Sequence, residues 1–110
     1  MPLTFPTPLP WQIIPFTGNR ILETSDAFAY LISQDGAGQT LTIPPNVDVS
    51  FVQGTQISFK QGGVGVITFA AGAGVMIESR GGFLNTNGQF AVVSIVQDSI
   101  NVWSLFGDTA

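Results

Sequence analysis

Residues 43–79 read IPPNVDVSFVQGTQISFKQGGVGVITFAAGAGVMIES, and this stretch decides the fold. It contains three short runs of strand-like composition, each closed by a turn with glycine: residues 55–60, 66–69 and 75–78. In the first run Ile57 and Phe59 alternate with polar residues, so the two apolar side chains share one face of a strand. Strands this short, separated by tight glycine turns, predict an antiparallel meander rather than a parallel sheet linked by helices.

The flanking segments add strands to the same pattern. They are expected at residues 27–33, 39–43, 89–97 and 100–106, the last two forming a hairpin that turns at Asp98-Ser99. Residues 90–96 are apolar on both faces, which is typical of a strand buried on both. In a small domain one face then often packs on the core and the other on a neighbouring subunit, and a closed barrel or sandwich gives the same pattern. The sequence therefore predicts an all-β domain over residues 17–110, a small antiparallel β-sandwich or barrel of short strands, with both architectures left open.

The composition indicates a single domain that associates with other chains. At 110 residues the chain has room for one core. Hydrophobic residues make up 45% of it and charged residues 9%, against about 25% charged in ordinary soluble domains. Uncharged polar side chains cover part of the surface, and we expect much of the remainder to face another subunit.

Charge and residue types exclude several classes of function. The formal net charge is −4, and Arg20, Lys60 and Arg80 are scattered, which argues against nucleic-acid binding because that draws on clustered Lys and Arg. Without cysteine there are no disulfides, thiolate zinc sites or thiol nucleophiles, and without histidine the commonest metal ligand and general base is missing. We therefore expect no cofactor and no metal.

A membrane partner is not expected either. The longest apolar runs fall well short of the roughly 20 residues of a membrane span. The first residues lack basic side chains, and their prolines interrupt any apolar helix that a signal peptide requires.

Two patterns that suggest chemistry are better explained as turns. Residues 63–68 lack the third glycine of the dinucleotide-binding fingerprint, and no helical pattern follows them. A carboxylate pair such as Glu78 and Asp98 can in principle flank a glycosidic bond, but no motif places the two together. Most acidic residues of the chain stand at turns, where aspartate favours the local backbone conformation. We therefore expect that the protein is not an enzyme.

The N-terminal segment is the most function-like feature of the chain. Residues 1–16 read MPLTFPTPLPWQIIPF, in which five prolines favour an extended, polyproline-like arm. The arm is unusually apolar for a linker. It either folds back on its own domain or docks on a neighbouring subunit or particle, and we favour docking. The predicted partner-binding side chains are Leu3, Phe5, Leu9, Trp11, Ile13, Ile14 and Phe16.

The order of several short motifs resembles a known family. These motifs are IPPN (43–46), GTQI (54–57), GxGxITF (63–69), GAGVxIxS (72–79) and VWSLFGD (102–108). In this order they resemble a β-rich module of bacteriophage virion proteins, which recurs at the C-terminal ends of tail-fibre and other structural proteins and also occurs alone. The resemblance covers residues 39–108. It implies a structural protein of the virion, assembled in the host cytoplasm, that forms a homotrimer, and it supplies no catalytic residues.

The residue patterns and the resemblance together leave three candidate functions. The favoured one is a capsid decoration or cement protein that trimerises on the head surface and grips the major capsid protein or another virion protein through its arm. The alternative is a tail-fibre or head-fibre tip that binds a host receptor or glycan, with Tyr30 or Trp103 stacking on sugar rings, although Trp103 fits a core position better. A virion-associated depolymerase is disfavoured because the chain lacks histidine, cysteine and a catalytic motif.

Overall fold

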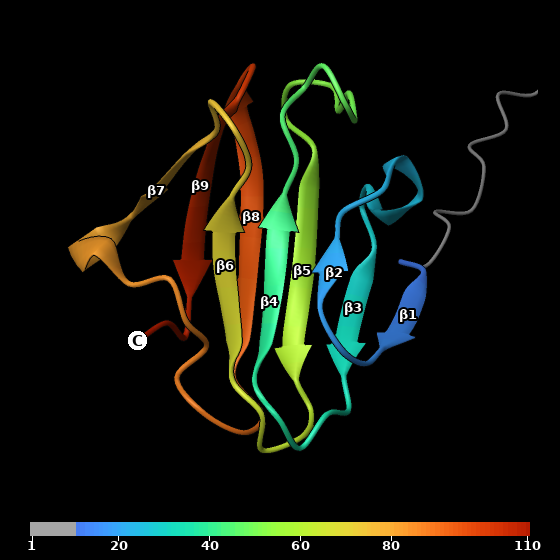
Figure 1. The fold of residues 1–110 in the computed structure, drawn as a ribbon, viewed down its shortest axis with the longest axis vertical. Helices are drawn as coiled ribbons and strands as arrows, with labels where there is room; N and C mark the ends of the chain where they lie inside the picture. Colours follow the sequence, from blue (N-terminus) through green and yellow to red (C-terminus); the bar gives the residue numbers. More distant parts are fainter. Residues whose placement is uncertain (1–10) are drawn as a thin grey trace, which may run out of the picture.

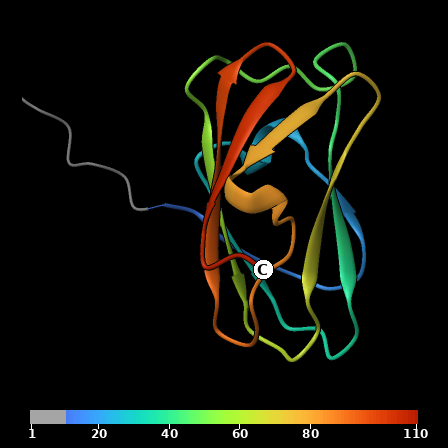
Figure 2. The ribbon, with the colours of Figure 1, turned by 90° about the vertical axis from the view of Figure 1, so that its left-hand side faces the viewer.

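A computed structural model describes residues 11–110, which form strands joined by turns and loops. The elements are β1 (Ile13–Phe16), β2 (Arg20–Ile21), η1 (Thr24–Asp26), β3 (Tyr30–Ser33), β4 (Gln39–Ile43), β5 (Gln56–Gln61), β6 (Ile67–Ala71), β7 (Met76–Ser79), η2 (Arg80–Gly82), β8 (Val92–Ser99) and β9 (Val102–Gly107), where η marks a short 3-10 turn. A six-stranded sheet, β1-β3-β5-β8-β9-β7, is called sheet A, and a three-stranded sheet, β2-β4-β6, is called sheet B. The two sheets face each other (Figures 1 and 2). The all-β prediction is confirmed, in the form of a two-layered sandwich.

The prediction of an antiparallel fold was wrong, because the sheets have mixed strand directions. In sheet A, β1, β3 and β5 are parallel, as are β7 and β9, and β8 is antiparallel to both β5 and β9. In sheet B all three strands are parallel. Figure 1 shows β1, β3 and β5 pointing down while β2, β4 and β6 point up. The glycine turns thus join strands in opposite sheets. Two parallel neighbours in one sheet are connected through a strand of the other sheet, which serves as the crossover that parallel strands need.

The first six strands are therefore successive coils of one winding. Tyr30 pairs with Ser58 in sheet A and Gln39 pairs with Ile67 in sheet B, an offset of 28 residues in both sheets. Residues 30–43 and 58–71 are thus two stacked coils of the same shape, as in repeat proteins whose units contact only their neighbours. The predicted final hairpin is confirmed as β8–β9, but it turns at Ile100-Asn101 rather than at Asp98-Ser99, which form the end of β8.

The core lies between the inward faces of the two sheets. Leu31, Ile57 and Phe59 from sheet A are fully buried against Leu41, Ile43, Ile67 and Phe69 from sheet B. Phe59 and Phe69 meet edge to face, with ring centroids 5.1 Å apart. The prediction that Ile57 and Phe59 share one face is confirmed, since the exposed fraction of both is zero.

Glycine allows the coils to stack at the lower end of the sandwich. The turn at residues 62–66 lies directly on the turn at residues 34–38. A Cβ atom at Gly65 would lie 1.9 Å from the carbonyl oxygen of Ala37, and one at Gly63 would lie 2.2 Å from that of Asp35. Any side chain at either position therefore forces the coils apart.

Polar side chains join the stacked turns to one another. The Asp35 carboxylate accepts hydrogen bonds from the backbone N–H groups of Gly18 in the preceding turn and Ala37 in its own turn, at 2.9 and 3.1 Å. These bonds, first that from Ala37 and then that from Gly18, lower the pKa of Asp35. Deeper in the same end, the buried hydroxyls of Ser33 and Thr86 donate to the side-chain oxygens of Gln39 and Gln61.

Candidate interaction surface

The outward face of sheet A carries two rows of side chains of which only Lys60 is charged. Strand pairing places Ile13, Tyr30, Ser58, Ser94 and Phe106 in one row across five strands. The next row is Pro15, Ile32, Lys60 and Val92. Ile13, Val92 and Phe106 are 62%, 43% and 49% exposed. We call these two rows the sheet A outer face.

The two serine hydroxyls of the sheet A outer face are satisfied within the chain. The hydroxyls of Ser58 and Ser94 lie 2.7 Å apart and bond to each other, and both residues are less than a tenth exposed. The Lys60 ammonium lies 5.5 Å from the centroid of the Phe90 ring, a cation–π contact. Another protein surface can therefore cover the two serines without leaving their hydroxyls unpaired.

Residues 90–96, predicted to be apolar on both faces, divide between the core and the sheet A outer face. Val93 and Ile95 point into the core and are 1% and 0% exposed. Val92 points outward and is largely exposed, while Val96 is partly buried. The contact of this outward side with a neighbouring subunit stays a prediction.

The predicted arm residues have different positions. Leu3, Phe5 and Leu9 lie outside the described residues. Ile13, Ile14 and Phe16 form part of β1, which pairs with β3, so the β domain begins at Ile13. Phe16 is 7% exposed and Ile14 packs against the core, so these two side chains serve their own domain. Trp11 and Ile13 remain exposed, at 46% and 62%, and can contact a partner.

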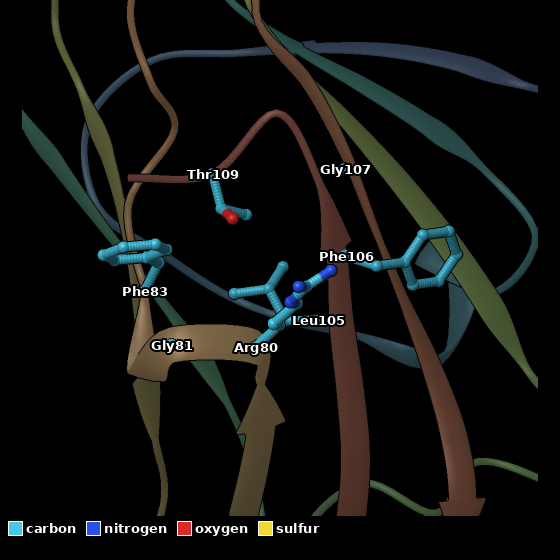
Figure 3. A pocket seen from close by; sticks show the side chains of 7 residues that line it. All are labelled: Arg80, Gly81, Phe83, Leu105, Phe106, Gly107 and Thr109. Atoms are coloured by element: carbon cyan, nitrogen blue, oxygen red, sulfur yellow. The ribbon is translucent and has the colours of Figure 1, made fainter.

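A recess opens at the β7 edge of the sandwich, beside η2 (Figure 3). Sheet A has six strands and sheet B three; in Figure 1 β6 overlies β8 and β9, while β7 extends past the edge of sheet B. Figure 2 shows η2 lying between the two layers at this edge. A cavity of about 470 Å³ remains, and its lining is Arg80, Gly81, Phe83, Leu105, Phe106, Gly107 and Thr109.

The recess combines apolar walls with few polar groups. Figure 3 shows the Phe83 ring and the Thr109 side chain on one side, and the Arg80 guanidinium beside Leu105. The Phe106 ring points away from the recess, toward the sheet A outer face. No acidic side chain is among the residues that line the recess.

Arg80 differs from the other two cations of the chain. Arg20 pairs with Asp26 at 2.6 Å, and Lys60 lies against Phe90. Arg80 forms no ion pair and no side-chain hydrogen bond within residues 11–110. Arg80 is exposed, so its guanidinium is hydrated in the free protein and is available at the recess to pair with an anionic ligand.

Other sequence-based candidates do not form a site. Glu78 lies in register with Ser104, whose hydroxyl donates to the Asp98 carboxylate, so both acids lie near one serine, but neither lines the recess. Trp103 is a core residue, 1% exposed, which leaves only Tyr30 of the two proposed stacking residues accessible. Within residues 11–110, acidic side chains do not gather into a potential metal site, and no helix is long and apolar enough to cross a membrane.

Sequence reasoning missed the recess entirely. No sequence motif links Arg80, Phe83 and Thr109. These residues meet only at the edge where sheet A extends past sheet B. Tyr30 and Ile32 on the sheet A outer face were detectable in principle, since residues 27–33 are apolar on both faces.

Comparisons of the chain with protein-family models, with curated proteins and with solved structures found no match. The resemblance to a bacteriophage virion module therefore stays a prediction.

Proposed function

We propose that this protein is a non-enzymatic structural protein of a bacteriophage virion, a capsid decoration or cement protein that acts as a homotrimer. The observation that carries the proposal is the sheet A outer face, where Ile13, Val92 and Phe106 are exposed in the single chain. Exposed apolar surface of this kind marks protein–protein contact.

The charge distribution supports association of identical copies through this face. The chain carries a net charge of −4, which opposes close approach of two copies. Lys60 is the one charged residue in the two rows of the sheet A outer face, and it is already in contact with Phe90. Subunits that meet here bury apolar area without bringing acidic side chains together.

Attachment to the particle is assigned to the N-terminal segment. Trp11 and Ile13 are exposed beside β1, and the segment that precedes them carries Leu3, Phe5 and Leu9. In the proposed virion this segment grips the major capsid protein or another virion protein. Each attached copy then adds buried area across the joints between capsid subunits, which raises the resistance of the shell to internal pressure.

The molar mass of the purified full-length protein in solution tests the proposed trimer. Light scattering is expected to give about three times the 11.6 kDa of one chain. A monomer that persists at high micromolar concentration, or a dimer, contradicts the proposed trimer.

Two deletions separate attachment from folding. Removal of residues 1–10 is expected to leave the β domain folded while abolishing binding to the particle. Removal of residues 1–16 also deletes β1 and buried Phe16, so it is expected to lower the free energy of unfolding as well. Normal particle binding after the shorter deletion would show that the segment is not the anchor.

A second candidate function is a fibre-tip module that binds a host receptor or glycan. The recess at η2 favours it, since this cavity is within the size range of small-ligand sites. Retention of the purified protein on host cells tests it, and the absence of binding to any susceptible host rejects it.

A further inference from the structure

The recess at η2 has a structural cause that makes it a lasting feature of the fold. Sheet B ends at β6, which overlies β8 and β9 in Figure 1, so β7 extends past its edge, and η2 with the segment after it fills only part of the space beside β6. Leu105 on β9 forms the floor and is 3% exposed, so the floor is part of the packed core. The cavity therefore does not depend on a mobile side chain closing over it.

Backbone geometry at η2 positions one wall of the recess. Gly81 has φ +72°, a left-handed conformation that glycine adopts readily. A Cβ atom there would lie 3.0 Å from the Phe83 ring, so only glycine lets this ring pack so closely on the turn. Phe83 is 50% exposed, and its ring offers an apolar surface to solvent at the recess.

Three groups with complementary chemistry thus surround one small volume. The Arg80 guanidinium offers paired N–H donors that match a carboxylate. The Phe83 ring offers a flat apolar wall, and the Thr109 hydroxyl both donates and accepts hydrogen bonds. A ligand that uses all three has a carboxylate, a compact ring with an apolar face, and hydroxyl groups.

We propose that this recess binds a sugar that bears a carboxylate, such as a uronic acid unit of an acidic polysaccharide. Arg80 pairs with the carboxylate, Phe83 packs against the C–H face of the sugar ring, and Thr109 bonds to a ring hydroxyl. This proposal gives the second candidate function, a fibre tip that binds a glycan, a class of ligand, and the biological role of the sugar binding rests on that function. Binding itself requires neither a trimer nor a particle, so its failure leaves the proposed decoration role untouched.

A titration of the full-length protein, followed by backbone amide chemical shifts, tests the ligand class. D-glucuronate is expected to shift the amides of Gly81, Gly107 and Thr109 in a saturable way, with a Kd on the order of 1 mM. D-glucose, which lacks the carboxylate, is expected to bind about tenfold more weakly. Benzoate has a carboxylate on a flat ring but no hydroxyl groups, and it is expected to bind more weakly than D-glucuronate.

Each contrary outcome overturns a defined part of the proposal. No saturable shift with D-glucuronate rejects the site. If D-glucose binds as tightly as D-glucuronate, the carboxylate does not contribute to binding, and the proposed role of Arg80 is rejected. Tighter binding of benzoate assigns the recess to an aromatic acid and rejects the sugar.

Substitutions then assign the binding to named side chains. Arg80→Gln is expected to weaken D-glucuronate binding about tenfold. Lys60→Gln is the matched control, because it removes the same charge on a different strand and is expected to leave Kd unchanged. An equal loss in both variants would mean that the ligand senses only overall charge, which rejects the site. Thr109→Val keeps the side-chain shape, and its expected loss of about fivefold gives a second test that does not depend on Arg80.

Discussion

The outward faces of the two sheets differ sharply, although the same winding builds both. On sheet B the outward positions of β4 and β6 are Thr40, Thr42, Thr68 and Ala70, small side chains that water covers readily, and the one large apolar side chain in register with them is Ile21 in the edge strand β2, 62% exposed. On sheet A the corresponding positions carry Ile13, Tyr30, Ile32, Val92 and Phe106. The inward faces are equally apolar, so core packing does not explain the difference. The difference is the basis for proposing that sheet A, rather than sheet B, faces a protein partner.

The largest expected effect comes from the core that the two sheets share. Phe59 on sheet A packs edge to face on Phe69 of sheet B and is fully buried. Phe59→Ala is expected to lower the free energy of unfolding by about 3–5 kcal/mol, through lost burial and the cavity left behind. Urea unfolding measures this change. An unfolding midpoint equal to that of the wild type would mean that the sheets are not held together at this point.

A smaller loss is expected from the turns that connect the sheets. Gly65→Ala places a Cβ atom against the carbonyl oxygen of Ala37, and is expected to cost about 1–3 kcal/mol of the free energy of unfolding. Gly36→Ala is the matched control in the neighbouring turn, where a Cβ meets no atom within 4 Å. It is expected to stabilise by about 0.4–1 kcal/mol, because it restricts the unfolded chain. Equal effects of the two substitutions would contradict the stacking of the turns.

The difference between the outer faces is tested directly by placing one negative charge on each. Phe106→Glu on sheet A and Thr40→Glu on sheet B are both expected to change the free energy of unfolding of one chain by less than about 0.5 kcal/mol. Phe106→Glu is expected to dissociate the proposed trimer, since its carboxylate would be buried at the proposed interface. Thr40→Glu is expected to leave the molar mass unchanged. Dissociation by the sheet B variant alone would reverse the assignment of the two faces.

The smallest effect is expected at the turns, where it depends on pH. The pKa of Asp35 is lowered in the folded protein by hydrogen bonds from Ala37 and Gly18, so ionisation of this carboxylate stabilises the fold above the pKa of the unfolded chain, about 3.9. That contribution is lost as the pH falls through the lower folded pKa. Asp35→Asn is therefore expected to lower the urea midpoint at pH 7 and to converge on the wild type near pH 2. A difference of the same size at both pH values would show that the charge is not involved.

Local patterns in the chain predicted the strands from β3 onward but not their partners, and they missed β1, which was expected to be part of an extended arm. Alternation correctly assigned Ile57 and Phe59 to the core, and the final hairpin was found because its strands are adjacent in sequence. The parallel pairing of residues 30–43 with residues 58–71 was not predicted, because the two coils share a shape and hardly any sequence. A glycine turn looks the same in sequence whether it leads to a neighbouring strand or to the opposite sheet.

The amino-acid sequence by itself determined that the domain is all-β, where its strands lie from residue 30 onward, that Ile57 and Phe59 enter the core, and that few charges are present, but it did not reveal β1 or the burial of Phe16. These properties depend on neighbours one to four residues away, through alternation, turn residues and composition. Only the tertiary structure decided that the strands wind as parallel coils, that one outer face is apolar, and that Arg80, Phe83 and Thr109 surround a recess. These properties depend on pairing between residues that lie 17 to 28 positions apart in the sequence, and on the unequal sizes of the two sheets. No local pattern encodes either.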